Sequence, residues 1–437
     1  MRTFGLFIKM AARNLVKYGR RSAQSAAAIF LGIFFVALAG AFMSGFSFRI
    51  IQDFIAAQGH IVVTAPGYAE RREMMPLNRL IQGAEAARLR FESAAPGVSA
   101  FASLYAAGLV SKGGKPETVP GEAAASGNTE STAVLCAGVM PYAAGAANPA
   151  FDSVRGGVTS GRFFGGSGDR GIVLSETTAM DIGAEPGDMV IFLCADAYNS
   201  FNMIELPLLA VFAGDEYSRE FSCIMDLESM QLATGVEDAA AQIAAYAMND
   251  GGMPLEPRNA ASRVAAVETA AAGLGLSPER WDSASGTIAS MIAFLDAFIV
   301  ITYVLFAVVA VVGIMNSILL SVQDRVRDFG TLRAIAFTGR GVSAIIAMET
   351  LLLGAFASLL AVLAAWGASA YFERHGIPLG NMLEGVWSSY PAELNTRTDL
   401  RQLFMSFAAG TLIPILAALY PMGMIRKMSI REALGFV

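Results

Sequence analysis

Long apolar segments alternate with polar ones along this chain, and their lengths predict four membrane-spanning helices. The segments cover residues 23–48, 288–322, 342–372 and 401–425. About 20 apolar residues cross the hydrocarbon core of a bilayer, so each segment is long enough to span it. The second segment exceeds this length, and its outer part is expected to project from the membrane as a stalk.

Two shorter stretches have helical periodicity with basic side chains between the apolar positions. Residues 1–22 carry six basic residues and no acid, and residues 323–341 place Val326, Phe329 and Leu332 on one helical face. Both patterns predict amphipathic helices at a membrane surface. Short loops rich in Lys and Arg remain in the cytoplasm, so both stretches and the basic tail 426–437 are expected inside. The alternative of a signal peptide is disfavoured at the N-terminus because no small-x-small cleavage site follows.

The region 49–287 contains no further apolar span and is therefore expected outside the cytoplasm, like the shorter loop 373–400. Its short alternating runs predict an α+β domain. Residues 49–130 and 233–287 form a mixed α/β, porter-like part, and residues 131–232 form an inserted β-rich part. Within it, helices are predicted over 78–94, 236–248 and 257–274, and strands over 98–111 and 171–180. The fold class is thus a four-helix membrane protein with a large extracytoplasmic α+β domain.

Composition supports a membrane protein and argues against chemistry within this chain. Of the 437 residues, 54% are apolar and 16% charged, and the net charge of −6 disfavours nucleic-acid binding. Only His60 and His375 are available, and both are interpreted as structural. No Walker A motif, metal-ligand spacing or catalytic triad is present, so no enzyme, metal or cofactor is predicted here. The three cysteines favour buried free thiols, with one disulfide in an oxidising compartment as the alternative.

The stretch from Asp324 to Arg333 carries closely spaced acidic and basic residues around Gly330-Thr331. This charged stretch and both ends of the chain resemble the FtsX-like permeases, the membrane subunits of ABC transporters of the MacB and LolCDE type. The resemblance extends to the lipoprotein-releasing subunits LolC and LolE through Gly59-His60-Ile61 and the central β region. It continues at Tyr420-Pro421 near the C-terminus. It implies a coupling helix that docks on a separate ATPase. Its residues are Asp324, Arg325, Arg327, Asp328, Gly330, Thr331, Leu332 and Arg333.

This resemblance implies a permease in a bacterial inner membrane with both termini in the cytoplasm. A LolD-like ATPase would supply the ATP and Mg site, and a second permease subunit, identical or related, would complete the transporter. The substrate would be a lipoprotein, extracted from the outer leaflet toward a periplasmic carrier. A MacB-like peptide or drug exporter and an FtsX-like mechanotransmitter that activates a cell-wall hydrolase are the alternatives.

Bulky apolar residues near the outer ends of the first two spans are candidates for the substrate path. On sequence alone, lipid contact and helix packing are the simpler interpretation of such residues, and a wall for an apolar substrate is the alternative. The candidates are Phe35, Phe42, Met43, Phe46, Ile292, Leu295 and Ile299.

Overall fold

The computed structural model describes residues 2–113, 131–143, 145–166, 168–213, 221–282, 338–378 and 393–427, and scattered helical residues between 293 and 331. The chain divides into two compact units. One comprises Met1–Arg49, Met291–Met382 and Pro391–Val437, and the other comprises Ile50–Ser290 and Leu383–Tyr390.

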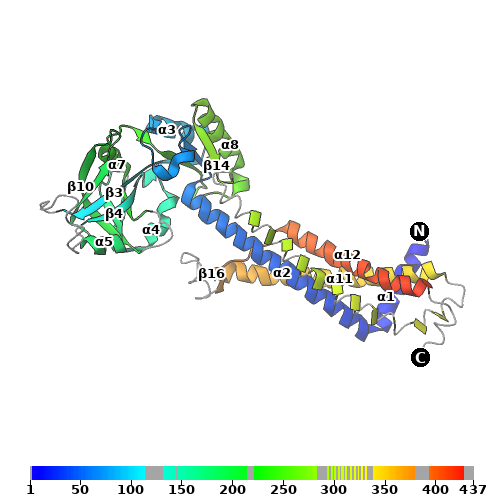
Figure 1. The fold of residues 1–437 in the computed structure, drawn as a ribbon. Coiled ribbons are helices and arrows are strands. Elements are labelled where there is room, and N and C mark those ends of the chain that lie inside the picture. Colours follow the sequence, from blue (N-terminus) through cyan, green and yellow to red (C-terminus); the bar gives the residue numbers. More distant parts are fainter. Residues whose placement is uncertain are drawn as a thin grey trace. The chain divides into compact units, whose positions relative to one another are not determined.

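The first unit is helical (Figure 1). A basic amphipathic helix, predicted over 1–22, ends earlier at Lys17, and the long apolar helix begins at Gly19 after a turn at Tyr18. The helices are α1 (Arg2–Lys17), α2 (Gly19–Gln58), α11 (Gly339–His375) and α12 (Leu400–Lys427), with a small strand pair of β15 (Ile377–Pro378) and β16 (Glu393–Leu394).

Three helices in the described residues are long and apolar enough to cross a membrane. They are Ser22–Gln58, Gly339–His375 and Leu400–Met424. The further span expected over 288–322 lies largely outside the described residues. The chain is therefore a membrane protein with at least these three candidate spans.

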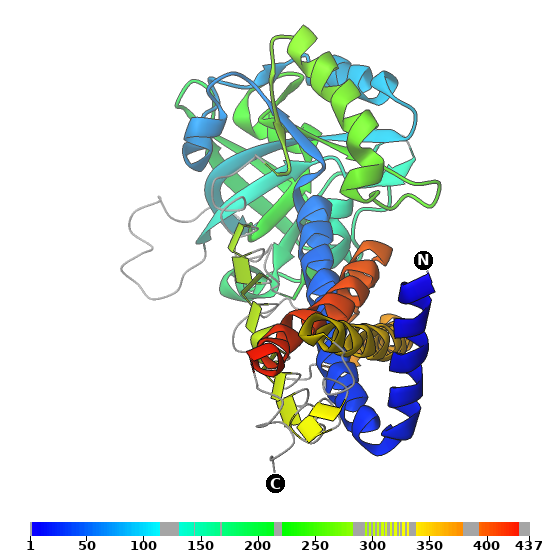
Figure 2. The same ribbon diagram turned by 90° about the vertical axis from the view of Figure 1, so that its right-hand side faces the viewer.

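The second unit is a mixed α+β domain built on one large sheet (Figures 1 and 2). Pairings β3–β4, β4–β11, β11–β8, β8–β10, β10–β9 and β9–β3 return to their starting strand and close a ring. The ring strands are β3 (Val98–Lys112), β4 (Ser131–Val139), β8 (Ile172–Ser175), β9 (Met189–Ala195), β10 (Phe201–Phe212) and β11 (Cys223–Asp226). Side chains alternate along a strand, so one set fills the interior of this barrel and the other faces outward.

Outside the ring, the sheet extends beyond β3 through three further strands. The order runs β3-β13-β1-β14, and an apolar core joins these strands to α3 and α8. The extension consists of β1 (Ile61–Thr64), β13 (Gln242–Ala247), β14 (Ser277–Arg280), α3 (Ala84–Ala94) and α8 (Pro257–Gly273). The remaining elements are η1 (Ala69–Met74), β2 (Ile81–Gln82), β5 (Tyr142–Ala143), β6 (Ala146–Ala147), η3 (Pro149–Phe151), α4 (Asp152–Gly156), β7 (Val158–Gly161), α5 (Glu176–Ile182), α7 (Leu227–Thr234) and β12 (Ala239–Ala240).

Several local predictions are wrong. Residues 236–248, predicted as helix, contain β12 and β13, because this alanine-rich run lies between β1 and β3 where small side chains fit both faces. The strand predicted over 171–180 ends at Ser175, whose hydroxyl caps α5 by accepting from the backbone N–H of Thr178. The helix predicted from 78 begins only at Ala84, after Gly83 at φ 66°.

Candidate functional site

The first span carries a row of phenylalanines on the side opposite its packing face. Ile29 and Ile33 of α2 are 1% exposed and pack in the core shared with α11 and α12. At 100° per residue, Phe35, Phe42 and Phe46 lie roughly 180–220° round the helix from Ile33. Phe35 is 52% exposed, and Phe42 and Phe46 are half-buried. The structure therefore places these three substrate-path candidates on one face.

The other candidates are less closely aligned with this row. Met43 is half-buried and lies about a quarter turn from the phenylalanine row. Ile292, Leu295 and Ile299 lie outside the described residues.

The packing face of α2 meets small residues of α11 and α12. A Cβ added at Gly410 would lie 2.5 Å from Ser358 Oγ and 2.6 Å from Ile33 Cγ1. Gly354 of α11 likewise approaches the backbone of α12, since a Cβ added there would lie 3.2 Å from the Gly410 carbonyl oxygen. Small residues let membrane helices approach closely, where dispersion and polar contacts hold them together.

Near the C-terminal end of the first span, Gly45 accommodates a backbone segment. A Cβ here would overlap the carbonyl oxygen of Asn395 and lie 3.0 Å from the Arg397 nitrogen. The Arg397 N–H donates to the Ala41 carbonyl at 3.0 Å, and its guanidinium lies 3.9 Å from the Phe48 ring centroid. We call residues 393–402 the outer strap.

The outer strap also contacts α2 through a side chain. Gln402 Nε2 donates to the Ala37 carbonyl at 3.0 Å, one helical turn before Ala41. The strap therefore fastens α12 to the first span through two main-chain carbonyls of α2.

The predicted coupling helix is described at a few positions only. Among the described residues, Val326 is 2% exposed and Gly330 is buried one turn later, whereas Arg327 and Thr331 are exposed. The two buried positions are four residues apart and so are the two exposed ones, which is the spacing of about one helical turn. Asp324, Arg325, Asp328, Leu332 and Arg333 lie outside the described residues.

We call the second unit the barrel domain. A cleft of about 240 Å³ in it has an acidic lining. Its carboxylates already have structural partners. Asp226 caps α7 by accepting from the Ser229 N–H at 2.9 Å, and Asp238 accepts from the Glu85 N–H at 2.9 Å. Arg170 and Glu228 pair at 2.6 Å. These bonds explain the acids as caps and pairs, so we assign no ligand to the cleft.

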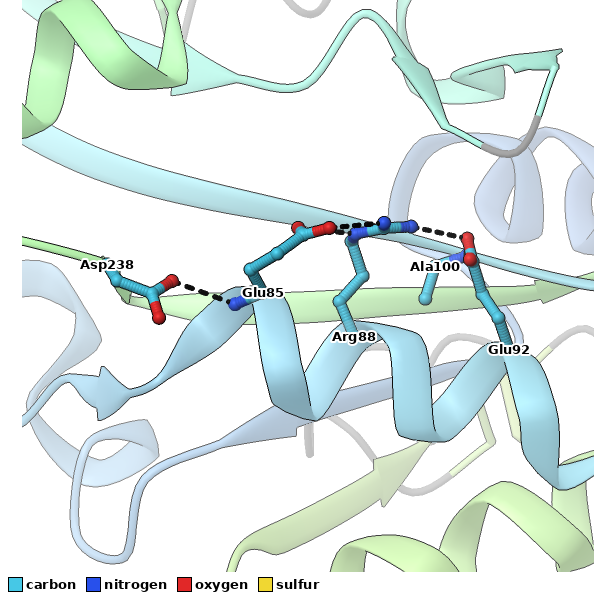
Figure 3. A network of polar contacts seen from close by, with 5 residues as sticks. All are labelled: Glu85, Arg88, Glu92, Ala100 and Asp238. Atoms are coloured by element: carbon cyan, nitrogen blue, oxygen red, sulfur yellow. Dashed lines mark hydrogen bonds and ion pairs between the residues drawn. The ribbon is translucent and has the colours of Figure 1, made fainter.

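Next to this cleft, a buried arginine holds α3 on the sheet (Figure 3). The Arg88 side chain is 8% exposed and contacts both Glu85 and Glu92 at 2.6 Å. Glu92 also accepts from the Ala100 N–H of β3 at 3.2 Å. The hydrogen bond from Arg88 lowers the pKa of Glu85. This network is structural.

His60 is also structural, as its position in a strand-like run suggested. Its ring is fully buried, Nε2 lies 2.8 Å from the Leu255 carbonyl, and Nδ1 accepts from the Ala247 N–H. Both ring nitrogens are used when the neutral ring carries its proton on Nε2. Burial lowers the pKa of His60, which favours this neutral form.

An apolar row crosses the outer surface of the barrel. Register places Ala133, Leu109, Leu193 and Met203 side by side on β4, β3, β9 and β10. Met203 is 67% exposed, and the neighbouring Phe201 is 83% exposed. No local sequence pattern predicts this surface, because the register of strands far apart in the chain creates it.

Two family models match the chain. A FtsX-like permease C-terminal domain matches residues 300–430, and a MacB-like periplasmic core domain matches residues 22–202. These matches support the FtsX/MacB/LolCDE family of permeases. No curated protein matches the chain. The family supports an ABC transporter permease subunit and implies association with an ABC ATPase subunit.

Domains of this permease family are typically non-catalytic components of transporters. The MacB-like match ends at residue 202, whereas β11 and most of β10 follow it. The barrel of this chain is therefore completed by residues beyond the matched region.

Proposed function

We propose that this permease subunit couples ATP hydrolysis by a separate LolD-like ATPase to the extraction of lipoproteins from the outer leaflet of the inner membrane. A second permease subunit would complete the transporter, and a periplasmic carrier would accept the substrate. Both termini and the segment 323–341 would lie in the cytoplasm. The barrel domain would lie outside.

The phenylalanine row of α2 is the observation that carries this proposal. An acyl chain is recognised by apolar area, and burying it is worth roughly 25 cal/mol per Å². Phe35, with 52% of its surface exposed, and the half-buried Phe42 and Phe46 offer such area, and in the described part of the chain none of the three belongs to the core that α2 shares with α11 and α12. A lipid-modified substrate entering sideways from the bilayer would reach this face directly.

Mechanical coupling would follow from the connections within the helical unit. ATP-driven closure of the ATPase would move the segment 323–341. Because α2, α11 and α12 share one core, movement at one end of a helix is transmitted along it. The outer strap would carry this movement to the stretch of α2 from Ala37 to Phe48, which contains Phe42 and Phe46.

The test is Phe42→Asn combined with Phe46→Asn, in the permease reconstituted with its ATPase. Lipoprotein release to a carrier should fall at least tenfold, while basal ATP hydrolysis stays within about twofold of wild type. Leu359→Asn is the matched control, because Leu359 is 49% exposed on a different span, α11. Release that stays at the control level would contradict the proposed path.

The same preparation separates the two alternatives. The family matches agree equally well with a MacB-like exporter and an FtsX-like mechanotransmitter. ATP-dependent export of an unlipidated peptide or drug without lipoprotein release would favour the first. Activation of a cell-wall hydrolase without transport would favour the second.

A further inference from the structure

The three cysteines of the chain lie together in the core of the barrel domain. Cys136 on β4, Cys194 on β9 and Cys223 on β11 belong to one buried apolar cluster. The sulfur atoms of Cys136 and Cys223 are 2.7 Å apart, and both residues are 0% exposed. Cys194 instead directs its thiol at the Ala233 carbonyl, at 3.5 Å.

Strand register pairs Cys136 with Cys223 specifically. They are direct partners on adjacent parallel strands, so both side chains point to the same face of the sheet. Neighbouring strands are about 4.8 Å apart, which falls within the Cα separation of about 4.4–6.8 Å that a disulfide requires. Cys194 lies two strands from β4, across β3, and its partner in register is Gly108.

We propose that Cys136 and Cys223 form a disulfide that fastens β11 to β4 inside the barrel, while Cys194 remains a free thiol. The proposal rests on the outer placement of the barrel domain made above, since disulfides persist in oxidising compartments. The oxidant would be a disulfide of a thiol–disulfide oxidoreductase. The two thiols lose two protons and two electrons, one S–S bond forms, and the oxidant's disulfide is reduced to two thiols.

Burial determines when the bond can form. Burial and the neighbouring thiol raise the pKa of Cys136 well above its ordinary value, and burial chiefly raises that of Cys194 to about 11. A protonated, enclosed thiol does not attack a disulfide, so oxidation must precede closure of β11 against β4. Once closed, the barrel shields the bond from reductants.

The bond would join distant parts of the sequence. Cys136 and Cys223 are 87 residues apart, and the intervening chain supplies β8, β9 and β10, half of the ring. Closing so long a loop restricts the unfolded chain strongly. The alternative of a thiolate metal site lacks support, because no group of three His, Cys, Asp or Glu in the described part of the chain is arranged to hold a metal.

Thiol counting on the full-length protein tests the pairing. Membranes are quenched in acid, denatured and alkylated with N-ethylmaleimide, then reduced and labelled with a 5-kDa polyethylene-glycol maleimide. Wild type should gain two tags and Cys194→Ser also two, whereas Cys136→Ser and Cys223→Ser should gain none. The wild-type result requires no variant to fold. No tags on wild type, or tags that disappear with Cys194→Ser, would overturn the pairing.

A second arm tests the placement separately. Tyr198→Cys, in a background with the three natural cysteines replaced by Ser, puts a reporter at a position that is 83% exposed. An impermeant maleimide should label it in intact spheroplasts. If the reporter cysteine is labelled and wild type nevertheless has three free thiols, the disulfide alone is overturned. No labelling of this folded variant would overturn the outer placement, and with it the oxidising environment that the disulfide needs.

Discussion

The close backbone approach at Gly45 gives the sharpest structural prediction. Gly45→Ala brings a methyl carbon into steric overlap with the Asn395 carbonyl oxygen, so the outer strap must move by about 1 Å to restore van der Waals contact. The three nearest atoms are all backbone atoms, so no side-chain rotation relieves the overlap.

The energetic cost follows from the contacts that the shift breaks. Loss of the hydrogen bond from Arg397 N–H to the Ala41 carbonyl costs about 1 kcal/mol. Loss of the contact between Arg397 and the Phe48 ring costs about 0.5–1 kcal/mol more. Strain adds about 1–3 kcal/mol, and the better helix propensity of alanine returns up to about 1 kcal/mol. The net destabilisation should be about 1.5–5 kcal/mol.

Two measurements check this prediction against a matched control. The midpoint of thermal unfolding in detergent should fall by roughly 3–20 °C, and trypsin should cleave faster after Arg397, as measured by mass spectrometry. Gly367→Ala is the control, because a Cβ at this glycine of α11 meets nothing within 4 Å. Equal midpoints and equal cleavage rates in the two variants would refute the close approach.

Two further predictions concern buried ionisable groups of the barrel domain. His60 is neutral in the folded protein and protonates near pH 6.5 in the unfolded chain, so the free energy of unfolding should fall as the pH drops from about 7 to 5. In urea titrations, His60→Gln should be less stable than wild type at pH 7 but should lose this pH dependence. A pH profile that the substitution leaves unchanged would contradict the buried neutral state of His60. Arg88→Met leaves the largely buried carboxylate of Glu92 without its partner and should lower the free energy of unfolding by about 3 kcal/mol. Glu85→Gln should lower it by less than about 1 kcal/mol, because the Glu85 side chain is 52% exposed. Because Arg88 lowers the pKa of Glu85, the contribution of this ion pair to the free energy of unfolding should be lost as pH falls below about 4.5. Equal stability of Arg88→Met and Glu85→Gln would contradict the buried network.

The membrane segments were predictable from sequence because lipid imposes a single requirement, a long uncharged helix. Residues 342–372 and 401–425 correspond to α11 and α12, each only a few residues longer. The first span is different: α2 continues to Gln58, beyond the predicted end at 48, because Arg49 and Asp53 mark the end of the apolar run but do not stop the helix.

The barrel domain was less predictable because its strands depend on distant partners. Residues 242–247 have helical propensity in isolation, yet β1 and β3 lie on either side of them and impose a strand. The sequence does carry local signals for α5 and α7. Ser175 and Asp226 are N-caps, and Gly183 and Gly235 end the helices at positive φ.

Helical spacing predicts one part of the candidate site, whereas the other features depend on long-range contacts. The phenylalanine row follows from helical spacing alone, since residues 35, 42 and 46 fall on one face of any α-helix. The outer strap and the pairing of Cys136 with Cys223 depend on residues 350 and 87 positions apart, which no local pattern connects.

The proposed mechanism requires a separate ATPase to act on the permease through the segment 323–341. The most direct measurement is co-purification of the ATPase with the full-length permease, comparing wild type with the variant Arg325→Glu/Arg333→Glu. We predict stoichiometric recovery with wild type and at least a tenfold loss with the variant, while equal amounts of permease remain in the membrane. Recovery of the ATPase at the wild-type level with the charge-reversed variant would contradict the account.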